Sequence, residues 1–368
     1  MGAWLKLFLV QCKRFKAAHY LPSNPLDKRK SEIVKQFKHD VEQFFRQFHM
    51  NTQQLLKGLH HVTATVNDAQ EDYDFYTKIL GLRLVKKTVN FDNNSVYHFY
   101  YADQVGTPGT VFTTFPYKGQ GVRAGEEGTG LIIATVFSVP STALAFWSER
   151  LTENGFDVIA SQRFGQEVRW FRDPSGLQLE LIADDSDTRT PYVTDEVSAE
   201  VGIRGIHHVT LWVAASDWDV LRTFLTSEMN MAEIGQEGER IRLKVNEGGA
   251  GSYLEIVRAV EDAPRGKNGL GTVHHVAWKV ETFEALLALR HRLVEELGMQ
   301  VTEVRDRKYF RSIYFRVPSH QLFEVATIPP GFAVDEPEEE LGTHLMLPDD
   351  KEANRAAIEA VLPVIQGT

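Results

Sequence analysis

Three adjacent histidine pairs recur along this chain of 368 residues, each at the start of a short segment rich in β-branched residues. The pairs are His60-His61, His207-His208 and His274-His275. Imidazole is the most common protein ligand for transition metals. A single histidine in a strand is usually a packed or edge residue, but three pairs at equivalent positions of a repeat indicate a shared chemical role. The sequence therefore predicts a metal site built on this repeat.

A fourth copy of the repeat lacks histidine and completes the pattern. Residues 130–136 match the lead-in and the strand of the other copies, with Ile133 at the position of the second histidine. The four copies begin roughly 70 residues apart, which is longer than the period of most solenoid repeats. The residue pattern of each copy predicts a strand, a helix and three further strands. We therefore expect an α+β fold of four βαβββ units, spanning residues 55–125, 126–200, 201–262 and 268–330.

The overall composition favours an ordinary soluble enzyme. Hydrophobic residues make up 43% of the chain, which is enough to bury two cores of ordinary domain size. A net charge of -10 argues against a nucleic-acid-binding surface, and the chain has no apolar run of about 18 residues that would predict a membrane span. Cys12 is the only cysteine, so no intrachain disulfide can form, and we expect a reducing compartment, the cytoplasm.

Two segments lie outside the repeat. Residues 1–50 are interpreted as an N-terminal extension outside the fold. A targeting segment and an amphipathic surface helix are two readings of it, and we favour a third, an upstream extension of a reading frame whose usual start is Met50. Residues 331–368 form a C-terminal tail. Its acidic run, from Asp335 to Glu340, is interpreted as a solvated surface without a function of its own.

The pairing of units decides which residues share a site. A βαβββ unit curves into a half-barrel with an open edge, so two units must combine to bury their faces. The marked positions on the first and last strands of both partners then face one cavity. In unit order, these positions hold His61 and Thr113, Ile133 and Glu180, His208 and Glu255, and His275 and Glu324.

Two pairings give different chemistry, and the residues alone leave both open. Pairing the third unit with the fourth gathers two histidines and two glutamates, a set that suits Lewis-acid or proton-transfer work. Its ligands would be His208, Glu255, His275 and Glu324. Pairing the first unit with the fourth gathers His61, His275 and Glu324. Two histidines and one carboxylate leave adjacent positions free for substrate and dioxygen on non-haem iron.

Longer motifs give the chain a resemblance to a known family. It resembles the ring-cleaving dioxygenases of the vicinal oxygen chelate superfamily, in particular the hydroquinone-cleaving group, from Gly58 to the C-terminal tail. The motifs are LHHVT at 59–63, YHFYYAD at 97–103, GTPGT at 106–110, TFP at 114–116, DRKYF at 306–310 and FEVAT at 323–327. This chain departs from the family at His208, where hydroquinone-cleaving relatives can lack a histidine, so a second metal site or the sequential pairing stays in consideration.

The resemblance implies a function and a set of site residues. It favours pairing the first unit with the fourth, with His61, His275 and Glu324 as ligands of Fe(II), or of Mn(II), which such open sites also accept. The other implied catalytic residues are His60, Thr63, His274, Arg307 and Tyr314. The implied reaction inserts dioxygen into a dihydroxylated aromatic ring, a hydroquinone or a catechol. No other partner is implied, and assembly as a homo-oligomer is left open.

The orientation of the first histidine in each pair depends on the regularity of its strand. Neighbouring residues of a strand point to opposite faces, so a regular strand would direct His60 and His274 away from the metal. A β-bulge would bring them back. His98 lies beside three aromatic residues and is interpreted as structural.

Two other classes of function stay open at this point. A glyoxalase-like isomerase or lyase would combine His208 and Glu255 with the ligands of the fourth unit, would need no dioxygen, and would use zinc, nickel or cobalt. A metal-free binding module would require an incomplete ligand set. The set in this chain is complete, which counts against a binding module.

Overall fold

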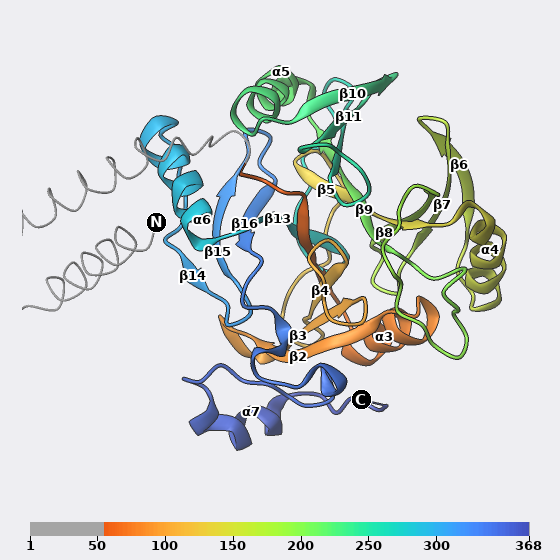
Figure 1. The fold of residues 1–368 in the computed structure, drawn as a ribbon, viewed down its shortest axis with the longest axis vertical. Coiled ribbons are helices and arrows are strands. Elements are labelled where there is room, and N and C mark those ends of the chain that lie inside the picture. Colours follow the sequence, from red (N-terminus) through yellow and green to blue (C-terminus); the bar gives the residue numbers. More distant parts are fainter. Residues whose placement is uncertain (1–54, 368) are drawn as a thin grey trace, which may run out of the picture. The chain divides into compact units, whose positions relative to one another are not determined.

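The structure, a computed structural model, describes residues 55–367 of the chain. Within these residues, strands form two curled eight-stranded sheets, and short helices lie along them (Figure 1). The expected extension at residues 1–50, including Met50, lies outside the described residues. None of the described helices is long and apolar enough to cross a membrane.

The first and fourth units share one sheet. The first unit contributes β1 (Leu59–Val66), β2 (Arg83–Asn90), β3 (Asn93–Ala102) and β4 (Val111–Pro116). The fourth unit contributes β13 (Thr272–Val280), β14 (Arg305–Asp306), β15 (Arg311–Arg316) and β16 (Leu322–Thr327). The strand order is β14-β15-β16-β13-β1-β4-β3-β2, so the opening strands of the two units, β1 and β13, meet at the centre as an antiparallel pair.

The second and third units form the other sheet in the same way. The second unit contributes β5 (Leu131–Val139), β6 (Ile159–Arg163), β7 (Gln166–Arg172) and β8 (Gln178–Ala183). The third unit contributes β9 (Gly205–Val213), β10 (Ala232–Glu237), β11 (Arg240–Lys244) and β12 (Tyr253–Arg258). The strand order is β10-β11-β12-β9-β5-β8-β7-β6, with β5 and β9 as the central antiparallel pair.

These sheets confirm the α+β fold of four βαβββ units and decide the pairing. The first unit combines with the fourth, and the second with the third. The sequential pairing of the third unit with the fourth is wrong, because β5 already occupies the edge of β9 that β13 would need. His208 and Glu255 therefore lie in a different sheet from His275 and Glu324. The four-ligand set of the glyoxalase-like alternative is not assembled.

One helix follows the first strand of each unit. These helices are α3 (Ala69–Asp74), α4 (Leu144–Glu153), α5 (Trp218–Thr223) and α6 (Phe283–His291). Wider π-helical turns extend three of them, namely η2 (Phe75–Ile79), η5 (Phe224–Glu228) and η6 (Arg292–Glu296). Asp68 caps α3, because its side chain accepts from the backbone N–H groups of Gln70 and Glu71. The helix α3 contacts β4, and α6 contacts β13, β15 and β16, so each covers the sheet of its own unit.

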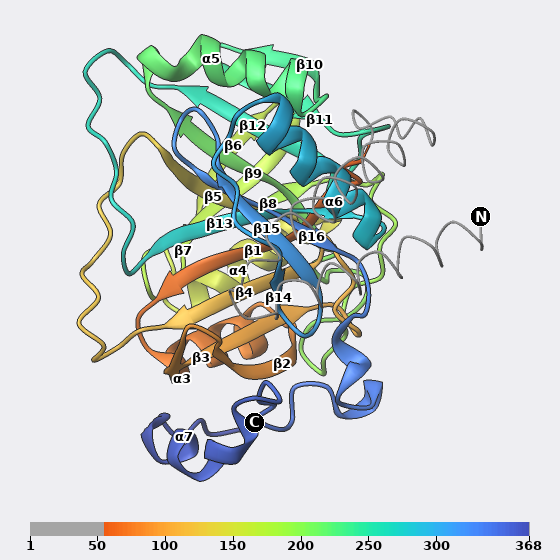
Figure 2. The same ribbon diagram turned by 90° about the vertical axis from the view of Figure 1, so that its left-hand side faces the viewer.

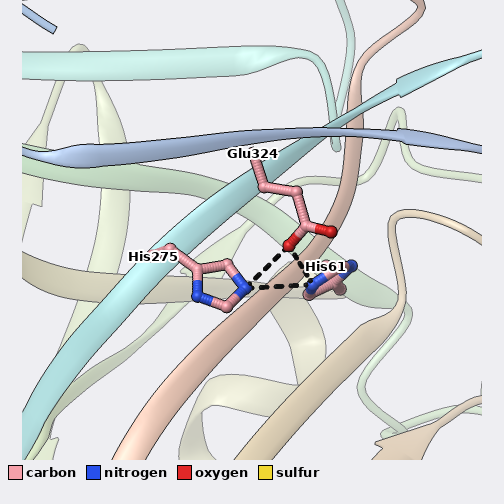
Figure 3. A group of neighbouring side chains, drawn as sticks. All are labelled: His61, His275 and Glu324. Atoms are coloured by element: carbon pink, nitrogen blue, oxygen red, sulfur yellow. Dashed lines mark hydrogen bonds and ion pairs between the residues drawn. The ribbon is translucent and has the colours of Figure 1, made fainter. Parts of the chain in front are cut away.

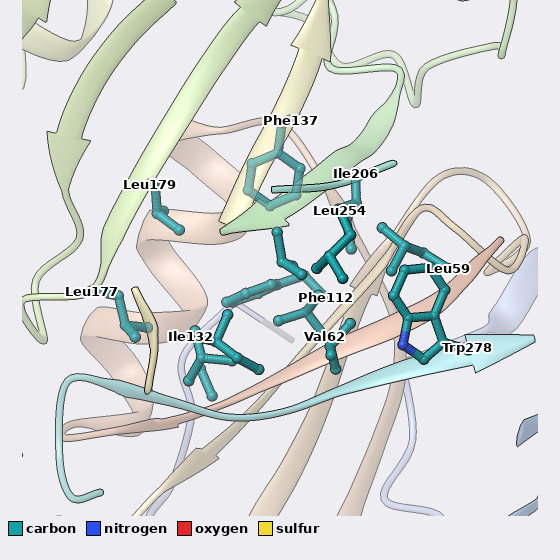
Figure 4. Packing of buried hydrophobic residues seen from close by; sticks show 14 of the residues in the cluster. Leu59, Val62, Phe112, Ile132, Phe137, Leu177, Leu179, Ile206, Leu254 and Trp278 are labelled. Carbon is teal, nitrogen blue, oxygen red and sulfur yellow. The ribbon is translucent and has the colours of Figure 1, made fainter. Parts of the chain in front are cut away.

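One hydrophobic core joins the two sheets (Figure 4). In β1, Val62 and Ala64 are fully buried in this core and alternate with His61 and Thr63 on the opposite face. The same core contains Phe112 and Trp278 of the first sheet and Phe137, Ile206 and Leu254 of the second. The marked polar positions of each sheet therefore face away from the shared core.

The C-terminal segment packs along the edge strand β2 before it reaches α7 (Arg355–Val361) (Figure 2). The side chain of Lys86 is completely buried and forms ion pairs with Asp335, at 2.6 Å, and with Glu336. The interpretation of the acidic run as a solvated surface is therefore wrong for these two residues, because a buried ammonium group requires nearby carboxylates. The rest of the run, Glu338–Glu340, is exposed.

Asp72 joins α3 to the strands that carry the candidate site. Its Oδ2 accepts hydrogen bonds from the hydroxyls of Tyr101, at 2.8 Å, and Thr114, at 2.6 Å. Its Oδ1 is buried and has no hydrogen-bond partner among the described residues. Burial raises the pKa of Asp72 to about 8, although the two hydrogen bonds act in the other direction. An aspartate in an unfolded chain has a pKa of about 3.9, so the folded protein binds this proton more tightly.

We expect the free energy of unfolding to fall as the pH rises from about 4 towards the raised pKa, because the folded state must then give up a proton that burial retains. Asp72→Asn keeps an acceptor for both hydroxyls and cannot ionise, so its free energy of unfolding should fall clearly less over the same pH range. Denaturant unfolding across this pH window measures the difference. Asp74→Asn, on the same helix and half-exposed, is the control. Parallel pH profiles for wild type and Asp72→Asn would contradict the expectation.

Candidate metal centre

The three predicted ligands lie on adjacent strands of the first sheet. His61 is on β1, His275 on β13 and Glu324 on β16. The pairing of β1 with β13 sets His275 beside Thr63, and it sets His61 beside Ala277. The pairing of β13 with β16 then sets Glu324 beside the same Ala277. The strand register therefore brings the three side chains together on one face of the sheet.

The ligand atoms of these side chains converge (Figure 3). Within 3.1 Å of one Glu324 oxygen, Oε2, lie the Nε2 atoms of His61, at 3.1 Å, and His275, at 2.9 Å. The two Nε2 atoms are 3.3 Å apart. Among the described residues, these three form the only group of at least three potential ligands with atoms within 4.8 Å of one another.

The donor set fits a divalent metal. Both Glu324 oxygens are buried, and neither has a hydrogen-bond partner that satisfies it among the described residues. Burial alone would raise the pKa of Glu324, but the neighbouring His61 and His275 hold it well below its usual value. A buried carboxylate that stays ionised without a hydrogen-bond donor is costly unless a cation binds it. Two imidazole nitrogens and one carboxylate are ligands that iron and manganese accept.

A β-bulge turns each histidine pair towards the same face. In the register of β1 with β13, His60 on the first strand and His274 on the second are the extra residues of the bulges and have no partner across the pair. The Nδ1 atoms of His60 and His61 lie 2.9 Å apart, and those of His274 and His275 lie 2.7 Å apart. Gly109 supports the first bulge by donating its backbone N–H to the His60 carbonyl at 2.8 Å. Its φ of 100° is a conformation that favours glycine.

The ring of His60 determines which ring nitrogen of His61 faces the candidate metal with its lone pair. His60 donates a ring N–H to the backbone carbonyl of Thr327, and because its Nδ1 faces His61, the donor is Nε2. Burial lowers the pKa of His60 to about 3, so the ring is neutral and its Nδ1 carries no proton. That Nδ1 must accept the Nδ1–H of His61. The lone pair of His61 Nε2 is therefore free to bind a metal.

A cavity of about 250 Å³ opens beside the three ligands. Aromatic side chains form much of its wall, including Phe91, Phe115 and Phe310. The ring centroid of Phe310 lies 4.9 Å from that of His60 and 5.2 Å from that of His61, so this residue also packs the first histidine pair in place. The volume is small for a ligand pocket and suits a single aromatic ring.

The structure divides the other predicted site residues into two groups. His274, Arg307 and Tyr314 line the cavity, whereas His60 and Thr63 lie outside its lining. The Thr63 hydroxyl lies 2.8 Å from that of Thr113, on the neighbouring strand. His60 and Thr63 can therefore act only through the residues that they contact.

Arg307 and Tyr314 form a pair of donors on the cavity wall. The Tyr314 hydroxyl accepts from Arg307 Nε at 3.2 Å and from the Ser312 hydroxyl at 3.2 Å. Burial raises the pKa of Tyr314, so the hydroxyl keeps a proton that it can donate into the cavity. Arg307 also lies 3.5 Å from Asp92. Because these two residues follow the outermost strands β14 and β2, their ion pair links the two ends of the sheet.

His98 lines the cavity, which its aromatic neighbours in the sequence do not reveal. Its Nε2 lies 2.9 Å from the Thr113 hydroxyl, and its Nδ1 lies 3.0 Å from the Tyr100 hydroxyl. Burial lowers the pKa of His98 well below its usual value, so the ring is neutral and both nitrogens are engaged by the protein. The spacing of His98 and Tyr100 by two residues in a strand is the signal that places them on one face.

In the second sheet, arginines surround the glutamates that correspond to Glu324. Arg242 lies opposite Glu255 on the neighbouring strand, as Tyr314 lies opposite Glu324. Its Nη2 is 2.8 Å from the Glu255 carboxylate, which also pairs with Arg240. Arg163 pairs with Glu180 in the same way. His208 contacts Glu255 at 3.3 Å, but guanidinium groups already neutralise both carboxylates, so no cation is needed there.

The strand register also corrects which residue of the histidine-free copy corresponds to the second histidine of the other copies. Ala134, and not Ile133, occupies the position of the second histidine, because it lies opposite Thr210 just as His61 lies opposite Ala277. Ile133 falls on the bulge. The alignment by the leading glycine fails here because the second unit carries one more residue between that glycine and the marked position.

Comparison with known proteins shows similarity over most of the chain. Residues 58–181 match the model of the Glyoxalase/Bleomycin resistance protein/Dioxygenase superfamily. MhqO of Bacillus subtilis (strain 168), provisionally named a ring-cleaving dioxygenase, is 40% identical over 302 residues, covering 82% of this chain and 94% of MhqO. A chlorohydroquinone/hydroquinone 1,2-dioxygenase of Sphingobium indicum is 36% identical over 304 residues, covering 80% of this chain and 92% of that enzyme.

A solved structure shows the same arrangement. The crystal structure of a protein from Bacillus subtilis, provisionally named a dioxygenase, matches this one with a TM-score of 0.80 at 39% sequence identity. The match covers 85% of this chain and 98% of the other. Both sheets therefore belong to the shared architecture.

Proposed function

Because the chain belongs to the glyoxalase/bleomycin resistance protein/dioxygenase superfamily, we propose that it is a metal-dependent dioxygenase that opens a dihydroxylated aromatic ring. The observation that carries this proposal is the convergence of His61, His275 and Glu324 beside a small aromatic-lined cavity. These three residues would hold a divalent metal, and a set of two histidines and one carboxylate would leave positions for a ring hydroxyl and dioxygen. We assign Fe(II) as the metal, with Mn(II) as the alternative that the same ligands accept.

The substrate that we propose is a hydroquinone, unsubstituted or with small substituents, with catechol as the alternative ring. Two observations support a single ring with polar substituents. The cavity is small, and it combines aromatic walls with the polar groups of Arg307 and Tyr314. The name of the Sphingobium relative states activity on hydroquinones, and the proposal extends that activity to this chain.

The side chains around the ligands would have distinct tasks. A metal held by the three ligands would lower the pKa of a ring hydroxyl and hold dioxygen beside the ring. Arg307 and Tyr314 would donate hydrogen bonds where negative charge develops on oxygen. His60 and His274 would orient the two ligand histidines, and Thr63 would act through Thr113. Phe91, Phe115 and Phe310 would exclude water from the reacting ring.

All of these residues belong to one chain. We propose the unit boundaries expected from the sequence, 55–125, 126–200, 201–262 and 268–330, as the limits of the four repeats. A reducing cytoplasm suits a chain with one cysteine.

A substrate panel tests the proposed function. The full chain is purified without oxygen, loaded with Fe(II) or Mn(II), and mixed with hydroquinone, methylhydroquinone, catechol or the hemithioacetal of methylglyoxal and glutathione. We expect dioxygen consumption together with a ring-opened product from hydroquinones. Isomerisation of the hemithioacetal without dioxygen, and no ring opening, would show a glyoxalase-like activity instead.

A further inference from the structure

Asn90 and Tyr117 form a hydrogen-bonded pair on the cavity wall. Asn90 ends β2 and Tyr117 follows β4, and both line the cavity that contains the three metal ligands. The Asn90 side-chain amide donates to the Tyr117 hydroxyl at 2.8 Å. Its carbonyl accepts from the backbone N–H of Asp92 at 2.9 Å, so both ends of the buried amide are engaged and its orientation is fixed.

The hydroxyl of Tyr117 has a proton to donate. It accepts from Asn90, and no group in the described part of the chain accepts from it. Burial raises the pKa of Tyr117, so the hydroxyl stays protonated at neutral pH. The backbone of Tyr117 is held as well, because its N–H donates to the Val66 carbonyl at 2.9 Å. A positioned hydroxyl of this kind on a cavity wall is a donor ready for a ligand.

The strands place Tyr117 at the opposite end of the cavity from the metal ligands. Thr113 lies beside Thr63, close to the ligands, whereas Tyr117 bonds to Val66, three residues farther along β1 and roughly 10 Å away along the strand. Phe115 lies between these levels. Its ring centroid is 6.3 Å from that of His274 and 6.2 Å from that of Tyr117. A substrate ring that packs on Phe115 would therefore have one end near the ligands and the other near Tyr117.

We propose that the Tyr117 hydroxyl, oriented by Asn90, donates a hydrogen bond to the substituent at the far end of the substrate ring, and so selects rings that carry an acceptor opposite the metal-bound hydroxyl. This inference rests on the proposed function for the identity of the ring. In a hydroquinone the second hydroxyl is para to the first and meets Tyr117. In a catechol the second hydroxyl is adjacent to the first and does not reach Tyr117, so the hydrogen bond that favours hydroquinone is lost.

Binding without turnover tests the inference. The dissociation constants of hydroquinone and of phenol, which lacks the far hydroxyl, are measured without oxygen on the Fe(II)-loaded protein. The variants are Tyr117→Phe and Asn90→Ala, and Tyr97→Phe is the matched control because its hydroxyl bonds to the Pro363 carbonyl. We expect Tyr117→Phe to weaken hydroquinone binding about fivefold, the typical value of one net hydrogen bond, and to leave phenol binding unchanged. Asn90→Ala should act in the same direction, and Tyr97→Phe should change neither.

The outcomes separate this inference from the function on which it rests. Equal weakening of hydroquinone and phenol binding, or no change for either, would overturn the role of Tyr117. In steady-state assays the wild type should favour hydroquinone over catechol, and Tyr117→Phe should reduce this preference through KM more than through kcat. A wild type that binds hydroquinone through Tyr117 but opens no ring would refute the proposed function and leave the binding contact in place.

Discussion

His61→Ala, His275→Ala and Glu324→Ala are each expected to abolish metal retention and to reduce ring opening to the background rate. Loss of a group that merely orients a metal ligand typically weakens binding by about 10- to 100-fold, so loss of a ligand itself should cost more. The three ligand atoms lie about 3 Å from one another, so each change leaves a metal with only two of its three protein ligands. Metal content after gel filtration and turnover on hydroquinone are the two measurements.

His208→Ala is the matched control for the ligand variants. His208 also belongs to a histidine pair and also contacts a buried glutamate, Glu255, but arginines neutralise that carboxylate. Metal content and turnover should remain at wild-type levels. Glu324→Gln adds a conservative change that preserves the size of the side chain and removes its charge. Loss of metal in His208→Ala with retention in His61→Ala would move the site to the second sheet and overturn the assignment.

Tyr314→Phe is expected to lower kcat by about 100- to 1,000-fold while the metal content stays unchanged, which is the usual effect of removing one preorganised donor from a site where charge develops on oxygen. The change removes one hydroxyl and leaves the ring in its edge-on contact with His275, at a centroid distance of 5.7 Å. Single-turnover rates and metal analysis on the same samples separate chemistry from metal binding. KM should change much less than kcat.

Tyr73→Phe controls for the loss of a tyrosine hydroxyl elsewhere in the first unit, because Tyr73 donates to the Gly367 carbonyl, away from the cavity. It should leave kcat unchanged. Unchanged turnover in Tyr314→Phe would make Tyr314 a packing residue. Loss of metal instead would mean that its hydroxyl supports the ligand His275 rather than the reacting ring.

The repeat and its marked positions, apart from Ile133, could be predicted from sequence because both depend on local patterns. Strand alternation and the spacing of the histidine pairs indicate the βαβββ unit, and Glu324 stands out as an acid inside an apolar strand. The pairing of units could not be derived in the same way. It depends on which strand edges meet across more than 200 residues of chain, and several pairings of the marked positions give plausible ligand sets.

The residues that the sequence failed to indicate depend on tertiary contacts. Phe310 reaches the first histidine pair from a loop in the fourth unit, and Lys86 becomes buried only because the C-terminal segment returns to the edge of β2. That Arg242 pairs with Glu255 is visible only in the strand register. It lies at the position in the second sheet that Tyr314 occupies in the first. Local propensity carries no information about such contacts.

The fate of labelled dioxygen tests the central claim most directly. Hydroquinones also oxidise to quinones at metal centres, and that reaction consumes dioxygen without opening the ring, so oxygen uptake alone does not suffice. The Fe(II)-loaded enzyme is therefore allowed to turn over hydroquinone under ¹⁸O₂, and the promptly quenched product is examined by mass spectrometry. The proposed function predicts a ring-opened acid that carries ¹⁸O in its new carboxylate. Unlabelled benzoquinone as the only product would contradict it.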